Sequence, residues 1–181
     1  DVNGTLQLYD AKARTWTKLP ITGGNLPAAY CDTGGICYDS KRDCLWIGHG
    51  GPLTRYDMKT GAVTNEGPPG KLVGAYMRAC TYVPELDMVF TGGRQMGPEG
   101  QPGNLAYDFE QKKWVGLVFP CSDGQPRVND KPYSDINLVV AYDPGLKIAT
   151  FHTNQKEIMV SRIDKASLKT FEVKMAVPKK K

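Results

Sequence analysis

The sequence lacks the features that would assign it to several large protein classes. It has no apolar run near the roughly 20 residues that cross a bilayer as a helix. No signal peptide is recognisable, and the chain opens at Asp1 rather than Met, which favours processing or excision from a longer chain. GxxxxGK[ST], GxSxG, HExxH and CxxCH motifs are all missing. The sequence therefore gives no support for a phosphate-binding loop, a serine hydrolase, a zincin or a c-type haem protein.

The chain also has only a small excess of positive over negative charge. The formal net charge of the 181 residues is +4, and three of the positive charges are Lys179, Lys180 and Lys181 at the C-terminus. The body of the chain is therefore close to neutral, whereas a nucleic-acid surface needs clustered Lys and Arg. We expect no nucleic-acid partner, and we expect the basic tail, residues 179–181, to be solvated.

Cysteine spacing excludes a zinc or CxxC redox motif. Cys37, Cys44 and Cys80 lie in apolar runs, where a free thiol behaves as a small buried hydrophobe. Cys31 and Cys121 lie in loops rich in Gly, Pro and Asp and are the only disulfide candidates. The odd total of five leaves at least one thiol unpaired within the chain. The redox compartment stays open, with a secreted or periplasmic location slightly favoured.

Glycine, proline and an internal repeat are what the sequence does contain. Its 20 Gly and 13 Pro indicate many turns. A Tyr-Asp pair followed by Trp or a substitute recurs at intervals of about 50 residues. The copies are Tyr9-Asp10 with Trp16, Tyr56-Asp57 with Val63, Tyr107-Asp108 with Trp114 and, less closely, Asp164 with Phe171.

Short runs rich in β-branched and aromatic residues lie between these copies and are bounded by turn residues. They predict three units of four strands: 35–38, 43–48, 53–57 and 62–65; 78–83, 87–91, 104–108 and 113–118; 136–142, 146–151, 157–163 and 168–173. Residues 5–9 and 15–19 match only the last two strands of a unit. No segment longer than a turn has helical periodicity.

Four strands in about 50 residues are typical of a β-propeller blade. We therefore expect an all-β fold made of antiparallel four-stranded blades. Residues 1–178 would form an incomplete ring of about 3.5 blades, with a half blade at 5–19 and blades at 34–66, 78–119 and 135–174.

The pattern resembles the kelch type of propeller. Met88-Val89-Phe90-Thr91-Gly92-Gly93 with Tyr107-Asp108 and Trp114 matches it best, and Leu8-Tyr9-Asp10 with Trp16 comes second. The last unit departs from it with Thr153-Asn154 in place of Gly-Gly. Quinoprotein propellers are the alternative, since Tyr56-Asp57-Met58-Lys59-Thr60-Gly61 looks like their turn.

Each repeated residue then has an expected physical role. The Asp would begin a tight turn by accepting local backbone N–H groups. The Trp would pack between neighbouring blades. Gly-Gly would permit a close backbone approach near the ring axis.

Loop lengths distinguish two faces of such blades. Loops joining strands one to two and three to four are tight and polar. The other loops are long, and binding residues concentrate on long loops of a rigid scaffold. We expect the functional face there, at 20–34, 48–52, 66–78, 92–103, 120–135 and 152–156.

The candidate ligand-binding residues on these loops are His49, His152, Arg78, Arg94, Arg127 and Asp123. His49 and His152 occupy equivalent blade positions and could hold a metal ion or bind a carboxylate or sugar. Capping of strand ends is their simpler role. Arginine beside acidic residues suits carboxylate or glycan recognition, and solvated loop charge is the simpler alternative. The resemblance extends to galactose-oxidase-like enzymes, but no Tyr-His dipeptide occurs here, so no copper ligands are assigned.

Three functions follow as hypotheses. The first is a binding module that recognises a protein or glycan on the long-loop face. The second is a metal-dependent oxidase or lyase using His49 and His152. The third is a structural subunit or fragment whose open ends pair with the remaining blades of a parent chain or with an oligomeric partner. No catalytic residue is assigned and no cofactor is predicted.

Overall fold

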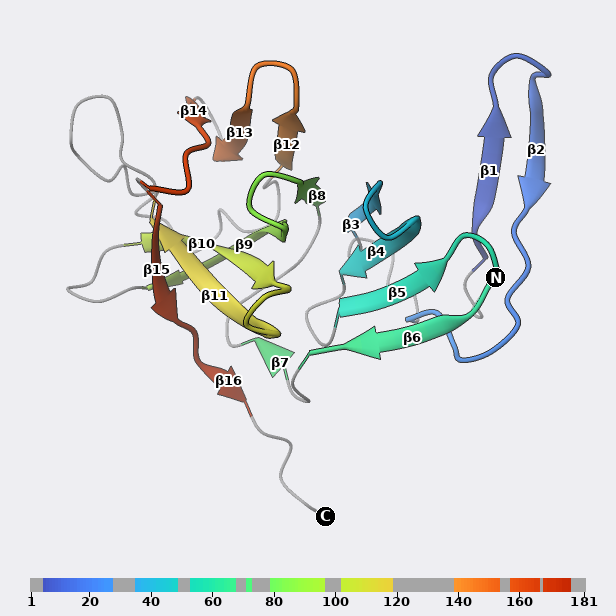
Figure 1. Cartoon of the computed structure of the whole chain (residues 1–181), viewed down its shortest axis with the longest axis horizontal. Coiled ribbons are helices and arrows are strands. Elements are labelled where there is room, and N and C mark those ends of the chain that lie inside the picture. The colour runs from blue at the N-terminus through green and yellow to red at the C-terminus, as the bar shows by residue number, and fades with distance from the viewer. Residues whose placement is uncertain are drawn as a thin grey trace.

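The computed structural model describes residues 5–27, 35–48, 53–67, 71–72, 79–96, 102–118, 139–153, 157–166 and 168–176. In these residues the regular structure consists of sixteen β-strands and no helix, so the expected all-β class is confirmed. No helix in the described ranges could span a membrane. The strands form separate antiparallel sheets that do not close on one another (Figure 1).

The first full unit is present as expected. Strands β3 (Gly35–Asp39), β4 (Cys44–Gly48), β5 (Leu53–Asp57) and β6 (Val63–Glu66) pair in chain order as a four-stranded sheet. The predicted strand positions agree to within one residue at each end. Alternate side chains of these strands point to opposite faces of the sheet. One face packs against the next sheet along the chain, and the other packs against residues that precede β3.

The second unit also has its four expected strands. They are β8 (Cys80–Val83), β9 (Met88–Met96), β10 (Pro102–Asp108) and β11 (Lys113–Val118), again in chain order. The β9–β10 register breaks at one place: Thr91 faces Leu105, but Arg94 faces Asn104. Gly92 and Gly93 are therefore extra residues in a β-bulge, a position where a missing side chain is an advantage.

The third unit corrects the expected blade. It has three strands, β12 (Val139–Asp143), β13 (Ile148–Thr153) and β14 (Glu157–Arg162). The fourth strand, β15 (Lys169–Glu172), does not pair with β14. It pairs with β11 of the second sheet, where Phe171 lies opposite Gly116. A Cβ at Gly116 would collide with the Phe171 ring, so this glycine leaves the space that β15 needs.

Two further strand pairs lie outside the units. The half unit is a separate hairpin of β1 (Gln7–Asp10) and β2 (Thr15–Lys18), with Tyr9 opposite Trp16. Near the other terminus, β16 (Met175–Ala176) pairs with β7 (Lys71–Leu72).

Aspartate turns connect the hairpins, as predicted for the Tyr-Asp pairs. Asp10 accepts hydrogen bonds from the backbone N–H groups of the residues two and three positions later, at 2.8 and 2.9 Å. Asp39, Asp57, Asp108 and Asp143 do the same. The residue four positions after each Asp has a positive φ, and it is a glycine only at Gly61, with φ 73°. The local bonds hold the other residues in this conformation.

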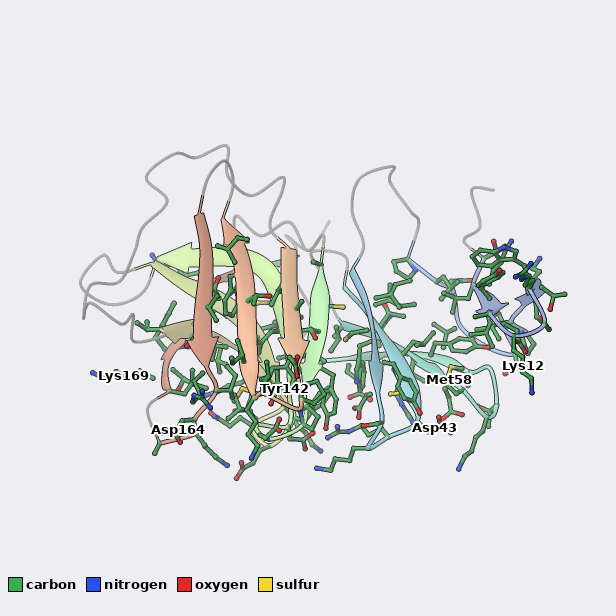
Figure 2. All side chains as sticks on the ribbon, turned by 90° about the horizontal axis from the view of Figure 1, so that it is seen from above. Lys12, Asp43, Met58, Tyr142, Asp164 and Lys169 are labelled. Atoms are coloured by element: carbon green, nitrogen blue, oxygen red, sulfur yellow. The ribbon has the colours of Figure 1, made fainter. Side chains whose placement is uncertain are left out.

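These turns gather on one side of the molecule, as the loop pattern predicted. Backbone hydrogen bonds join the two turns of each unit. Met58 N–H donates to the Asp43 carbonyl, Phe109 N–H to the Asp87 carbonyl and Ile163 N–H to the Lys147 carbonyl. In Figure 2 the labelled Asp43, Met58 and Asp164 lie along the same side. We call this side the turn face.

The core consists of three clusters, each between neighbouring sheets. The first joins β3–β6 to the second sheet and includes Trp46, Leu53, Tyr82, Tyr107 and Trp114. The second joins the second and third sheets, and the third joins the base of the hairpin to β3–β6. Trp114 therefore packs between units, as predicted. The same prediction is wrong for Trp16, which is 66% exposed because no sheet in the described part of the chain covers its side of the hairpin.

Candidate functional site

Most of the ligand-binding residues proposed from the sequence fall outside the described part of the chain. His49, Arg78, Asp123 and Arg127 lie outside the described residues. The backbones of Arg94 and His152 are described, in β9 and β13, but their side chains are not. The structure therefore does not bring the six candidates together into a site, nor does it separate them.

Arg94 and His152 do share one placement in the fold. Both lie toward the end of the second strand of their unit, remote from the turn that begins that strand. Arg94 faces Asn104, and β9 and β10 go on pairing as far as Met96 and Pro102, beyond Thr91, the last β9 residue that pairs with β8. His152 lies between Val139 and Ile158 in the third sheet. Both positions are thus on the side opposite the turn face.

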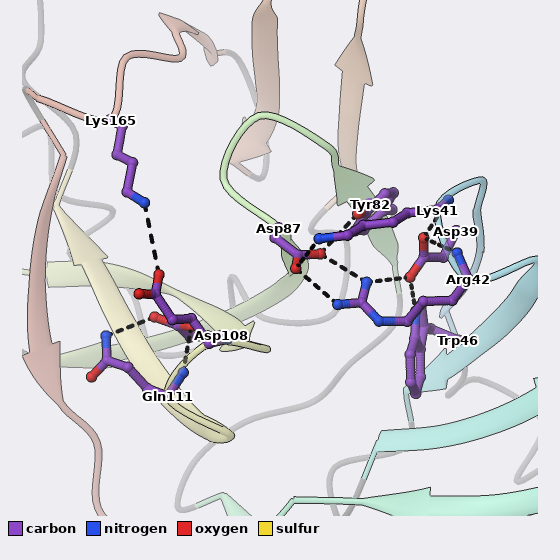
Figure 3. Close-up of polar contacts among 10 residues, drawn as sticks. Asp39, Lys41, Arg42, Trp46, Tyr82, Asp87, Asp108, Gln111 and Lys165 are labelled. Carbon is purple, nitrogen blue, oxygen red and sulfur yellow. Dashed lines mark hydrogen bonds and ion pairs between the residues drawn. The ribbon is translucent and has the colours of Figure 1, made fainter.

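The best-defined polar cluster lies instead on the turn face, between the first and second sheets. It joins the turn 39–43 to the turn 83–87 (Figure 3). Arg42 lies at its centre and donates to both carboxylate oxygens of Asp87, at 2.7 and 2.8 Å. The same guanidinium donates to Asp39 at 2.8 Å and lies 4.0 Å from the centroid of the Phe109 ring. We call Asp39, Arg42 and Asp87 the turn clamp.

Neighbouring donors saturate both carboxylates of the turn clamp. Asp39, which is fully buried, also accepts the indole N–H of Trp46 at 2.9 Å and two backbone N–H groups of its own turn. Asp87 also accepts the Tyr82 hydroxyl at 2.9 Å and the Lys41 ammonium at 2.7 Å. Each of the four oxygens therefore has two donors, which is the usual requirement for burying such a group.

The electrostatics follow from these contacts. The Arg42 guanidinium, with help from Lys41 and Tyr82, holds the pKa of Asp87 well below its usual range. Burial, together with the hydrogen bond to Asp87, raises the pKa of Tyr82. Two carboxylates and two cations leave the cluster without net charge. It therefore offers no free acid, base or vacant ligand position, and its chemistry is that of a fixed ion pair linking two sheets.

A departure from the turn pattern is the sequence signal for this cluster. Val83 stands where the other turns have their first Asp, and the acid of this turn is Asp87, four residues later, in the positive-φ position. Asp43 occupies the same position one unit earlier and accepts the Tyr38 hydroxyl just as Asp87 accepts that of Tyr82. Local patterns do not show that Arg42 reaches Asp87, so sequence reasoning missed the clamp.

The thiols predicted to be buried lie in the same junction. Cys44 and Cys80 are buried, Cys37 is half-buried, and none of these three forms a disulfide. A side-chain contact with Cys80 and burial raise the pKa of the Cys37 thiol, which favours the neutral, unreactive form. Cys31 and Cys121, the proposed disulfide candidates, lie outside the described residues.

Within the described ranges, no three His, Cys, Asp or Glu side chains gather as a metal site would require. A scan against protein-family models matched no family, and a search of curated proteins found no similar sequence.

Proposed function

We propose that the protein is an interaction module of the propeller type that binds a protein partner on the side opposite its turn face. The observation that carries this proposal is the contrast between the two ends of the strands. At the turn face, carboxylates such as Asp39 and Asp108 are already hydrogen-bonded by their own turns. A surface whose polar groups are saturated has little left to offer a ligand.

The opposite side has the geometry that recognition uses. The β9–β10 ribbon extends there past β8, carrying Arg94 just after the bulge at Gly92 and Gly93. Bulges often redirect a side chain at binding sites. A projecting ribbon whose outer edge has no paired strand among the described residues suits a protein partner, because a second chain can add backbone hydrogen bonds to it. The kelch-like repeat read from the sequence is consistent with such a module.

Site-specific photocrosslinking tests the proposal. A photoreactive amino acid is placed at position 94 or 152, with Lys59 in a turn-face hairpin as the matched control position. In an extract of the source cells, we expect protein adducts from positions 94 and 152 and none from position 59. Arg94→Ala, Arg127→Ala and His152→Ala together should abolish retention of the crosslinked partner. Retention by the triple variant would contradict the proposal, and release by free sugars would assign the ligand to the glycans instead.

A second candidate function is assembly, in which the chain is a structural subunit of a larger array of sheets. The observation that favours it is the set of large apolar side chains exposed at both ends of the molecule, including Trp16 and Ile158, each 66% exposed. Scattered exposed apolar residues need no explanation. Trp16, however, occupies the repeat position of Trp114, which is buried between two sheets, so its exposure does need one.

A further inference from the structure

The first and second full sheets meet through a contact between an apolar strand face and an aromatic pair. Leu53 of β5 and the cross-strand pair Tyr107 and Trp114 of β10 and β11 belong to the same buried cluster. The two rings are T-shaped with centroids 5.4 Å apart, and the three residues are at most 2% exposed. The outward face of the third strand in one unit thus packs toward the Tyr–Trp pair of the next.

Both halves of this contact recur in the chain, and in each case no sheet among the described residues packs on them. The hairpin has the same cross-strand pair in Tyr9 and Trp16, with ring centroids 4.9 Å apart, but these residues are 45% and 66% exposed. We call them the leading pair. They occupy the positions of Tyr107 and Trp114, because Asp10 follows Tyr9 and begins the turn just as Asp108 follows Tyr107.

The other half lies on β14. Val160 stands four residues before the turn residue Asp164, as Leu53 stands four residues before Asp57. Val160 and its neighbour on the same face, Ile158, are 61% and 66% exposed. We call them the trailing pair. They point away from the second sheet, since Phe151 and Ala149 on the opposite face of this sheet belong to the cluster shared with it.

We propose that the protein self-associates head to tail, with the trailing pair of one copy packed on the leading pair of a second copy. The occupant is inferred to be a second copy because the chain already joins these two surface types once, between its first and second full sheets. The hairpin and β14 lie at opposite ends of the molecule in Figure 1. A copy that docks at one end therefore leaves its own second surface free for another copy, which is a heterologous interface.

Complementation between two surface variants tests the proposal on the full chain. Trp16→Glu removes the leading pair, Val160→Glu removes the trailing pair, and Leu146→Glu is the control. Leu146 is 61% exposed but belongs to a turn and to neither surface. All three side chains are exposed in the monomer, so the urea midpoint of unfolding should stay close to that of the unmodified chain. Masses are measured by light scattering across a concentration series.

We expect the unmodified chain and the Leu146 variant to exceed the monomer mass of 19.9 kDa as concentration rises. Each surface variant alone should remain monomeric, with its dissociation constant raised at least about tenfold. An equal mixture of the two variants should restore a species of twice the monomer mass, because one intact surface of each kind is then present. An unmodified chain that stays monomeric at about 100 μM would overturn the proposal, since such a contact would be weaker than most specific interfaces. A mixture that stays monomeric while the unmodified chain associates would also overturn it.

Discussion

Removing Arg42 should destabilise the fold by separating its first two sheets. In Arg42→Met the aliphatic part of the side chain is kept, and the three hydrogen bonds of 2.7 to 2.8 Å to Asp39 and Asp87 are lost. Breaking a buried ion pair from one side costs about 3–5 kcal/mol, because a carboxylate stays behind without its partner. Asp39 is fully buried, so the free-energy cost of leaving its carboxylate without Arg42 applies in full. The Asp87 side chain is 25% exposed and keeps its hydrogen bonds to Lys41 and Tyr82, so its cost is smaller.

The expected loss is therefore about 3 kcal/mol at neutral pH, near the low end of that range. For a chain of this size it corresponds to a fall in Tm of about 6–12 °C. Urea unfolding followed by the fluorescence of the buried Trp46 and Trp114 measures it. Lys41→Met is the matched control. Lys41 is 61% exposed and contributes one ion pair, so its removal should cost at most about 0.5 kcal/mol.

The dependence on pH separates charge from packing in this variant. The pKa of Asp87 is lowered in the folded state, so its contribution is complete above the unfolded pKa of about 3.9 and is lost as the pH falls below that value. The difference in unfolding free energy between the unmodified chain and Arg42→Met should therefore shrink between about pH 7 and pH 2.5. A difference that stays constant over this range would refute the argument. It would mean that Arg42 acts through its packing on Phe109.

Two paired comparisons test the turns. Asp108→Ala should cost about 1–2 kcal/mol, because two backbone N–H groups lose a 3% exposed acceptor. Asp10→Ala, which removes the same two backbone contacts from an exposed turn, should lower Tm less in the same scanning calorimetry experiment, because Asp108 is buried and also accepts the Gln111 side-chain amide. Equal losses would contradict this expectation. Gly61→Ala should lower Tm more than Gly145→Ala. Gly61 has a φ of 73°, and a Cβ there would come within 2.6 Å of the Pro20 carbonyl oxygen, whereas at Gly145 the nearest atom is 3.3 Å away. The reverse order would contradict the strain argument.

Local chemistry explains which parts of the fold the sequence could predict. Each Asp turn is made by one carboxylate and the next few residues, so the Tyr-Asp pairs locate the hairpins and the strands beside them. The alternation of apolar and polar residues along each strand then predicts which face of the strand is buried. The pairing of β15 depends instead on the space above Gly116, which belongs to another sheet, and no pattern near Phe171 indicates it.

The candidate site was harder to predict because its contacts connect distant parts of the chain. Arg42 and Asp87 lie in different units, and nothing in either turn alone requires them to meet. The exposure of Trp16 has a similar cause. Its local sequence matches that of Trp114, and the difference lies in whether another sheet covers it. The long-loop residues proposed from the sequence remain a prediction.

The pairing of β16 with β7 has a consequence for the order in which the protein folds. The aspartate hairpins close over a few residues and can form in microseconds, whereas β7 and β16 are about 100 residues apart in the chain. The entropy lost in closing so long a loop is recovered only when the intervening sheets are already packed. The β7–β16 pair is therefore expected to form late in folding and to open early under denaturant. Its amides should then exchange with solvent deuterium before those of β9 and β10, which lie inside the second sheet.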